Sequence, residues 1–509
     1  MNQLIKLPEP LLLFRHDQAT EDPRDGLTLF GPLDVAAPFG VRFGVVGTQQ
    51  GISLFTRWVS SIQRLVRTKK QIASRPPFPG FESIFRIPWP MNPLQQALIK
   101  EDALRRCLYQ DDRYQRVFQT VELFASEILR VHREEEAKAD IWFVVIPDEV
   151  KKYCSPLAKV EPNLRVEAQR QFATELRENV RIAKNLQRNP SLFQEDNLAA
   201  APYAYKEHFR NQLKARLLLD QIPTQVVRES TIASVGPQGP TSREQTSELL
   251  QSQIAWNIST TAFYKLGGRP WKVQGIRPGV AYVGLVFKRS INSQDGTSAA
   301  CGAQMFLDSG DGLVFKGADG HWFNQETEEF HLTRAAAAEL IAKASKTYSL
   351  KHGDRPPAEL FIHGKTRFNS QEWQGFLDAV PEQTNVVGIR IQDELSFKIY
   401  SPLDTPVLRG MAYIVDSKRA YLWTKGWIPR LRTYPGMEVP KPLTIEVSRG
   451  EANIEVVLQD ILALTKLSYN TCRFGDGRPI TLKFADAIGE VLVTRPIENA
   501  PPLPFMYYI

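Results

Sequence analysis

The residues best suited to bind an anion are three basic side chains on two expected helices. Lys265 falls in the last turn of a helix that Gly267 and Pro270 must end, because glycine accepts the left-handed cap conformation and proline forbids continuation. Arg210 and Lys214 lie four residues apart and therefore share one helix face. Several such donors around one anion would form a selective site, because each charge-assisted hydrogen bond contributes roughly 1.5 to 3 kcal/mol. The local alternative is that Lys265 complements the helix dipole and that the other two side chains lie on a solvated face.

Strands and helices alternate along the first half of the chain, which predicts an α/β fold. Apolar runs predict buried strands at 42–48 and 140–148. The segments between them predict helices at 51–70 and 92–133 and a proline-rich surface loop at 74–93. Further on, the sequence predicts a polar helix at 161–189, a helix at 207–219 leading to a turn that ends at Gln225, and a flexible loop at 234–247.

After Trp271 the pattern changes to a meander of strands followed by alternating helices and strands. Strands are expected at 281–287, 300–306, 312–316 and 359–363, and helices at 333–347 and 370–380. We therefore place a domain boundary near residue 275, which divides the chain into an N-terminal lead-in with a first domain (1–275) and a second domain (276–509).

Composition indicates a globular chain with a preference for polyanions. The 509 residues carry a net charge of +7 with a pI near 9.0, and 43% are hydrophobic. The apolar runs are far shorter than the roughly 20 residues of a membrane helix. Residues 1–13 lack the pattern of a signal peptide, so a cytoplasmic location is expected and no membrane partner. The scattered cysteines and histidines match neither a disulfide framework nor a zinc site.

The helix end at Lys265 resembles the end of the Argonaute MID domain. Asn257, then Lys265 eight positions on, then Leu-Gly-Gly-x-Pro-Trp carry the resemblance. In that family the lysine binds the 5′-phosphate of a guide strand. At family spacing the resemblance implies that Arg210, Lys214 and Gln225 complete the pocket, with arginine where tyrosine is usual, whereas Thr261 replaces a further family lysine.

The end of the chain enters the same implied pocket. Residues 504–509 are apolar, Pro-Phe-Met-Tyr-Tyr-Ile. In the family this tail packs between the two domains with its carboxylate near the guide phosphate. The resemblance therefore implies that Ile509 contributes to guide binding and that a divalent cation, Mg²⁺, bridges Ile509 and the phosphate.

The second half resembles PIWI, an RNase H-like domain that cleaves with clustered carboxylates and two divalent cations. The family's first aspartate falls on Val286 and its second on Lys365, so only Asp486 near the end is retained. Valine cannot bind a cation, and lysine repels one. A catalytically inactive site is therefore expected. The family's mobile glutamate cannot be placed, although Glu326, Glu328 and Glu329 lie in a suitable loop.

Basic and aromatic residues interleave between 417 and 436, which suits a groove that follows a phosphate backbone. An ordinary amphipathic hairpin would show the same pattern. The candidate backbone contacts are Lys418, Arg419, Lys425, Arg430 and Arg432.

Together these features resemble a short prokaryotic Argonaute with a Rossmann-like MID domain followed by an inactive PIWI domain. The resemblance implies a non-enzymatic subunit that uses a 5′-phosphorylated guide RNA to recognise single-stranded target DNA. It also implies a partner protein with an APAZ region and a TIR, sirtuin-like or nuclease effector, active in defence against plasmids or phage. The alternatives are an active guide-dependent nuclease and a non-catalytic RNA-binding scaffold.

Overall fold

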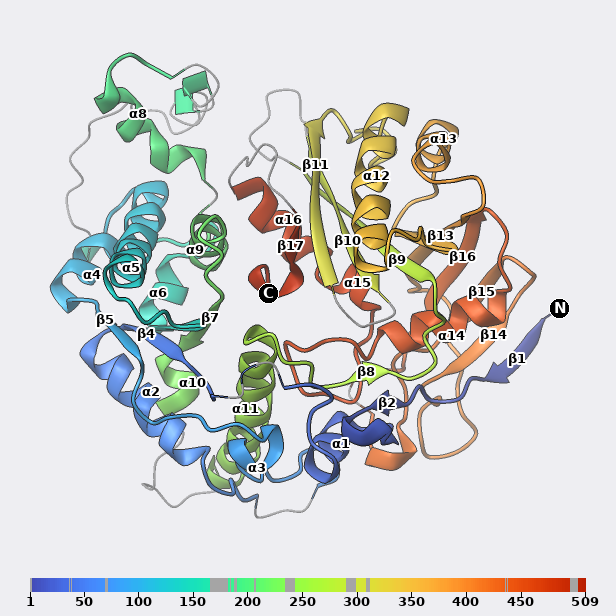
Figure 1. Cartoon of the computed structure of the whole chain (residues 1–509), viewed down its shortest axis with the longest axis horizontal. Helices are drawn as coiled ribbons and strands as arrows, with labels where there is room; N and C mark the ends of the chain where they lie inside the picture. The colour runs from blue at the N-terminus through green and yellow to red at the C-terminus, as the bar shows by residue number, and fades with distance from the viewer. Residues whose placement is uncertain are drawn as a thin grey trace.

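The protein consists of a four-stranded sheet and a ten-stranded sheet, each covered by helices, lying side by side (Figure 1). The structure is a computed structural model. It describes residues 2–509 apart from 36, 38, 69–71, 165–181, 184, 187–189, 206, 234–242, 290–298, 308–311, 435, 437 and 495–501. The predicted α/β class is confirmed.

The four-stranded sheet is parallel and forms the centre of the first half. Its order is β5 (Gln95–Leu98), β4 (Phe43–Gly47), β6 (Ile141–Ile146) and β7 (Thr224–Arg228). All six residues of β6 are buried, as expected of a strand with helices on both faces. One face packs on α2 (Gln49–Ser61), α3 (Phe81–Phe85) and α11 (Arg243–Lys265), and the other on α4 (Glu101–Leu108), α5 (Arg113–Glu134) and α9 (Phe209–Leu217). Shorter helices α6 (Asp148–Tyr153), α8 (Gln194–Ala200) and α10 (Glu229–Ala233) complete this half.

Three local predictions for this half were wrong. Residues 92–133 are not one helix, because Gln95–Leu98 forms β5 beside β4, so sheet pairing overrides the helical spacing of its leucines. The helix expected to reach residue 70 ends at Ser61. The segment 74–93 is no surface loop: its aromatic residues are buried, and Phe78 packs edge-on against Trp256 with ring centroids 5.2 Å apart.

Two expected segments fall largely outside the described residues. The structure leaves most of the predicted polar helix at 161–189 undescribed. Of the predicted loop at 234–247, residues 234–242 are likewise undescribed, whereas 243–247 already belong to α11.

The ten-stranded sheet forms the centre of the second half. Its order is β1 (Gln3–Lys6), β14 (Met411–Ile414), β15 (Arg419–Leu422), β16 (Leu443–Arg449), β13 (Asn385–Asp393), β12 (Glu359–Gly364), β9 (Val280–Arg289), β10 (Ala299–Leu307), β11 (Gly312–Gly320) and β17 (Leu503–Pro504). Strands β9, β12 and β13 run parallel. One face packs on α12 (Arg334–Lys351) and α13 (Ser370–Asp378), and the other on α14 (Ile454–Leu464), α15 (Ile480–Lys483) and α16 (Ala485–Thr494).

The N-terminal residues belong to both halves. Strand β1 is the edge strand of the ten-stranded sheet, which the division at residue 275 did not anticipate. The chain then continues through β2 (Leu12–Leu13), which pairs with β3 (Ala19–Thr20) and with β8 (Lys272–Val273), and enters α1 (Pro23–Leu29). We call residues 2–13 the N-terminal strap. One hydrophobic cluster includes residues of both sheets, so the two halves form a single packed body.

Candidate nucleic-acid interface

Two lysines from different helices meet the last residue of the sequence where the two halves join. Lys214 lies in α9 and Lys265 ends α11; the 3-10 helix η5 (Phe505–Tyr507) brings Ile509 between them, at the position marked C in Figure 1. The ammonium groups of Lys214 and Lys265 each donate to the Ile509 backbone oxygen at 2.6 Å. Both also donate to the Thr224 carbonyl oxygen, at 3.2 and 2.8 Å.

This site is closed to solvent. Lys214 is 3% exposed, and Lys265 and Ile509 are each 1% exposed. Burial lowers the pKa of both lysines well below the ordinary value, and the neighbouring cationic groups lower it further: Lys265 and Arg210 act on Lys214, and Arg210 acts on Lys265. A bound anion would therefore stabilise the charged form of both lysines.

Arg210 lies one helical turn before Lys214 and is half-buried. Burial lowers the pKa of its guanidinium group. The side chain makes no hydrogen bond or ion pair with any residue that the structure describes. Since a guanidinium carries five N–H donors in a fork that matches phosphate oxygens, Arg210 is the donor beside the lysines that has its bonding capacity unused.

Of the remaining residues predicted for the pocket, one contacts a pocket lysine and the other bonds to a different segment of the chain. The Gln225 side-chain oxygen accepts from the Lys265 ammonium at 2.9 Å. The Asn257 side-chain oxygen instead accepts from the backbone N–H of Cys472 at 3.0 Å, so it holds the segment around Cys472 in place. Thr261, where the family lysine was missing, is buried and donates to the Asn257 carbonyl oxygen at 2.8 Å.

The helix end has the structure that its sequence predicts. Gly267 adopts φ 84°, the left-handed conformation expected at a helix cap. Trp271 is fully buried, and its indole N–H donates to the Lys466 carbonyl oxygen at 3.0 Å. The helix stop therefore sets the position of Lys265 and anchors the junction of the two halves. Sequence reasoning missed the Thr224 carbonyl, because backbone acceptors carry no sequence signal.

The three positions aligned with nuclease carboxylates lie on or beside β9 and β12, two neighbouring interior strands of the second sheet. Val286 on β9 is 1% exposed and packs against α16 near Gly489. Lys365 follows β12, and its ammonium lies 3.6 Å from the carboxylate of Asp486 in the first turn of α16. Among the described residues, no three His, Cys, Asp or Glu side chains gather as a metal site would require.

The loop considered for a mobile glutamate lies between β11 and α12. Of its three candidates, Glu326 and Glu328 are exposed, whereas Glu329 is half-buried and its carboxylate lies 3.3 Å from His331. The structure does not single out one of them.

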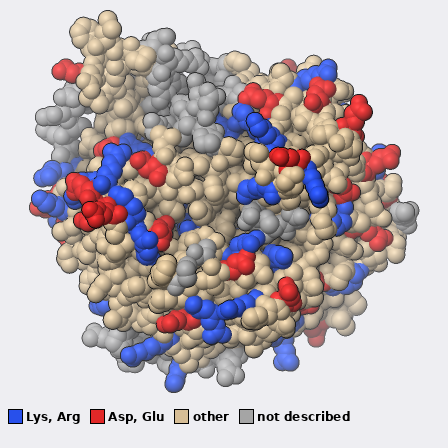
Figure 2. All heavy atoms as spheres, viewed as in Figure 1, with Lys and Arg blue, Asp and Glu red and all other residues tan. Residues whose placement is uncertain are grey.

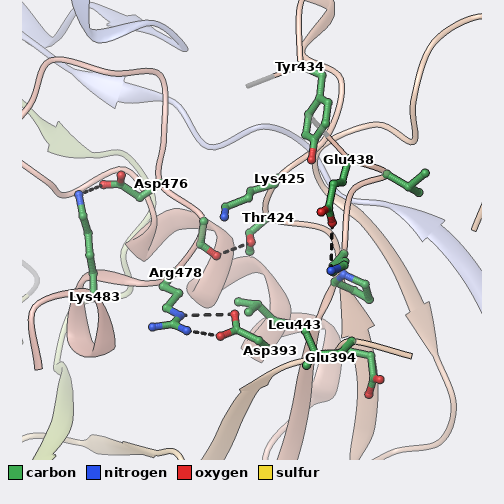
Figure 3. Close-up of a pocket in the computed structure, with 15 residues that line it drawn as sticks. Asp393, Glu394, Thr424, Lys425, Tyr434, Glu438, Leu443, Asp476, Arg478 and Lys483 are labelled. Carbon is green, nitrogen blue, oxygen red and sulfur yellow. Dashed lines mark hydrogen bonds and ion pairs between the residues drawn. The ribbon is translucent and has the colours of Figure 1, made fainter. Parts of the chain in front are cut away.

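The five basic residues between 417 and 436 are all exposed but do not form one row. Lys418 precedes β15 and Arg419 is its first residue, whereas the other three follow the far end of that strand. Arg430 forms an ion pair with Asp25. Lys425 lines a cavity (Figure 3). Figure 2 shows basic and acidic side chains interspersed on the viewed face, so the net charge forms no uniform patch there.

Comparison with solved structures identifies the architecture. The chain is similar to Clostridium butyricum Argonaute bound to a guide DNA and a 19-mer target DNA, with TM-score 0.62 and 15% identity over 100% of this chain and 55% of that chain. It is also similar to A. aeolicus Argonaute, with TM-score 0.53 and 14% identity over 99% and 55%, and to Drosophila Piwi, with TM-score 0.55 and 12% identity over 99% and 56%. The chain has an Argonaute fold.

The likeness to Argonaute structures is one of shape. The chain spans about half the length of the Argonautes it matches, and at these identities the likeness shows the fold alone. No protein-family model and no curated protein matches the sequence. No helix among the described residues is long and apolar enough to span a membrane.

Proposed function

We propose that the chain is a guide-binding Argonaute subunit that holds the 5′-phosphate of a guide RNA at Arg210, Lys214, Gln225 and Lys265 and recognises single-stranded target DNA. The observation that carries the proposal is the convergence of two buried lysines on one backbone oxygen, with no carboxylate side chain of the described residues bonded to either ammonium. The Argonaute fold supports the proposal, because one solved structure with this fold is bound to a guide DNA and a target DNA.

The hydrogen bonds of the pocket explain how a phosphate could enter. Each ammonium has three donors, and both sets are fully used. Lys214 donates to Tyr507 at 3.4 Å, Thr224 at 3.2 Å and Ile509 at 2.6 Å. The two longer bonds are the weaker ones, so an incoming phosphate oxygen would replace them first. Arg210 would then donate to the same phosphate without losing a bond.

The implied Mg²⁺ remains a prediction. The Ile509 oxygen already accepts from two ammonium groups, a set of neighbours that suits an anion better than a cation. Asn257 would support the pocket indirectly, because its side-chain oxygen accepts from the backbone N–H of Cys472. No step of guide binding proposed here depends on a metal.

The proposal includes target binding without cleavage. Val286 offers no oxygen to a cation, and the Lys365 ammonium lies beside Asp486, where it would oppose a second positive charge. The exposed basic residues from Lys418 to Arg432 would contact strand backbones.

A separate protein would supply the effector activity. We propose that an APAZ-containing protein with a TIR, sirtuin-like or nuclease effector joins this chain, and that target recognition activates it in defence inside the cytoplasm.

The test compares RNA that carries a 5′-phosphate with the same RNA ending in a 5′-hydroxyl. The wild-type protein should prefer the phosphate, and the double variant Lys214→Met with Lys265→Met should lose the preference. Lys346→Met, an exposed lysine of α12, is the matched control. Equal binding of both RNAs by the wild-type protein would refute the proposed pocket.

A further inference from the structure

The last turns of α11 contact a segment of the second half that follows α14. We call this segment, residues 465–472, the junction segment. The backbone N–H of Cys472 donates to the Asn257 side-chain oxygen at 3.0 Å, and the Tyr469 carbonyl oxygen lies 3.3 Å from the Thr261 hydroxyl. Asn257 and Thr261 lie four residues apart, so the junction segment holds one face of the helix at two successive turns.

Contacts with Tyr469 extend this attachment to both sides of Lys265. The Tyr469 ring packs against the ring of Tyr264, the residue before Lys265, with centroids 4.7 Å apart. Its hydroxyl donates to the Trp271 carbonyl oxygen at 2.8 Å, and the Tyr469 and Trp271 rings lie edge to face with centroids 5.2 Å apart. The helix end that carries Lys265 is therefore fixed before and after its glycine cap.

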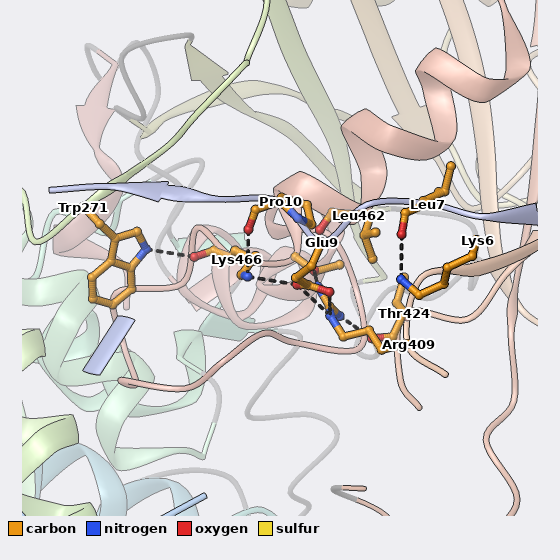
Figure 4. Close-up of polar contacts among 10 residues, drawn as sticks. Lys6, Leu7, Glu9, Pro10, Trp271, Arg409, Thr424, Leu462 and Lys466 are labelled. Atoms are coloured by element: carbon orange, nitrogen blue, oxygen red, sulfur yellow. Dashed lines mark hydrogen bonds and ion pairs between the residues drawn. The ribbon is translucent and has the colours of Figure 1, made fainter. Parts of the chain in front are cut away.

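The N-terminal strap holds the junction segment in turn (Figure 4). The Lys466 ammonium donates to a Glu9 carboxylate oxygen and to the Pro10 carbonyl oxygen, both at 2.9 Å. The Lys466 carbonyl oxygen accepts from the indole N–H of Trp271 at 3.0 Å. A single residue, Lys466, thus connects Glu9 of the strap with the segment that follows α11.

The Glu9 carboxylate lies between two buried cations. The Glu9 side chain is 11% exposed and the Lys466 side chain 0%. Arg409, which is also buried, donates from Nε to both Glu9 carboxylate oxygens at 3.1 Å. Burial lowers the pKa of Lys466 to about 8, and the negative charge of Glu9 opposes that shift. Two buried cations thus share one carboxylate, and without it their repulsion would displace Lys466.

We infer that Glu9 is a positioning residue for the lysine pocket: it holds Lys466, and Lys466 fixes the end of α11 from which Lys265 enters the pocket. The inference rests on the proposed function and adds a residue outside the pocket on which phosphate selectivity depends. Two ammonium groups bind a phosphate selectively only where supporting contacts keep them in place. Because coupling between two sites is reciprocal, a guide phosphate held at Lys265 should also stabilise the docked strap.

The first experiment measures the ratio of the affinity for 5′-phosphorylated RNA to the affinity for the same RNA with a 5′-hydroxyl. Glu9→Gln should lower this ratio about fivefold or more, the lower end of the usual coupling between two sites. Glu372→Gln is the matched control, because it removes the charge of another buried carboxylate, which bonds to His331 and to the start of α13. The control should keep the wild-type ratio.

A second pair of variants keeps the test open if Glu9→Gln does not fold. Trp271→Phe keeps an aromatic ring in the core but removes the N–H that donates to Lys466, so it should lower the ratio in the same way. Trp423→Phe is its control, because that indole is also fully buried and donates to a backbone oxygen elsewhere, that of Pro440, at 3.1 Å. An equal loss of the ratio in Trp423→Phe would overturn the positioning role, since it would show a general effect of lost stability.

Hydrogen exchange tests the reciprocal effect. At saturation, RNA with a 5′-phosphate should slow amide exchange in the strap about fivefold or more relative to RNA with a 5′-hydroxyl. In the unliganded protein, Glu9→Gln should speed exchange at the amides of 266–268, which bond to α11 carbonyl oxygens, more than exchange in α12. Unchanged exchange at 266–268 would overturn the inference.

The affinity ratio of the wild-type protein separates this inference from the proposed function. A wild-type ratio of one would refute the lysine pocket and the inference together. A wild-type ratio well above one that both Glu9→Gln and Trp271→Phe retain would refute the inference alone and leave the pocket standing.

Discussion

Lys214 and Lys265 both donate a hydrogen bond to the Ile509 backbone oxygen, each at 2.6 Å, although they lie on different helices. Two ammonium groups that share one acceptor oxygen in a closed site repel each other, and no carboxylate side chain among the described residues bonds to either ammonium. This arrangement determines how the pocket should respond to protons, to mutation and to an anion.

Binding of a 5′-phosphate should take up protons. Burial and neighbouring cations lower the folded-state pKa of both lysines, and a bound phosphate would raise it again. Affinity should therefore fall as the pH rises toward the ordinary lysine value of 10.5. Calorimetry in buffers of different ionisation enthalpy should show the uptake; buffer-independent heats would contradict it.

The unliganded protein should be stabilised when either lysine loses its charge. A base whose folded pKa is lowered binds fewer protons in the folded state, so the free energy of unfolding rises with pH between the folded pKa and about 10.5. Lys265→Met should be neutral or stabilising, by up to roughly 1 to 4 kcal/mol, as when apolar residues replace buried charges. Urea denaturation measures the change, with Lys346→Met as control. A clear loss of stability would show that the ammonium hydrogen bonds outweigh the burial of charge.

Removal of the Glu9 charge should have the opposite effect. Glu9→Gln leaves Arg409 and Lys466 buried without their anion, which should cost about 3 to 5 kcal/mol of unfolding free energy. Nearby cations lower the pKa of Glu9, so its contribution is present at neutral pH and lost as the pH falls below the ordinary value of 4.5. Glu339→Gln, which breaks an exposed pair with Lys343 on α12, should cost less than about 1 kcal/mol. Equal costs for the two variants would contradict this account.

The protein loaded with guide should not cut its target in Mg²⁺ or Mn²⁺. Lys365→Asp should not restore cleavage, because Val286 on the neighbouring strand still supplies no oxygen ligand. Separation of labelled target strands on a denaturing gel measures the outcome. Cleavage by the wild-type protein that disappears in Asp486→Ala would establish the nuclease alternative.

Patterns that depend on neighbouring residues in sequence predicted much of the fold. The buried run of β6 and the Gly267 cap of α11 lie where the sequence places them. Strand β5 was mistaken for helix, because four residues are too few to show a period and its pairing with β4 depends on distant residues. Phe78 and Phe85 of the segment 74–93 pack against Trp256 and Phe263 of α11, contacts that local composition does not reveal.

In the candidate site, too, the sequence predicted some contacts and missed others. The resemblance to the MID domain implied that Lys214, Gln225 and Lys265 lie together, and the structure brings them together. Asn257 instead faces Cys472, and the contacts of Glu9 with Arg409 and Lys466 were not foreseen. Pairs separated by most of the chain leave no periodic signal in one sequence. Their partners are decided by how the two sheets pack.

The placement of β1 has a consequence for synthesis on the ribosome. Residues 3–6 are made long before residues 411–414, with which they pair, and β17 at the other edge of the same sheet is formed by residues 503–504. Both edges therefore wait for late parts of the chain, and such distant pairing is slow to form. During translation the nascent strap would stay exposed to chaperones and proteases, so its survival would depend on the speed of elongation.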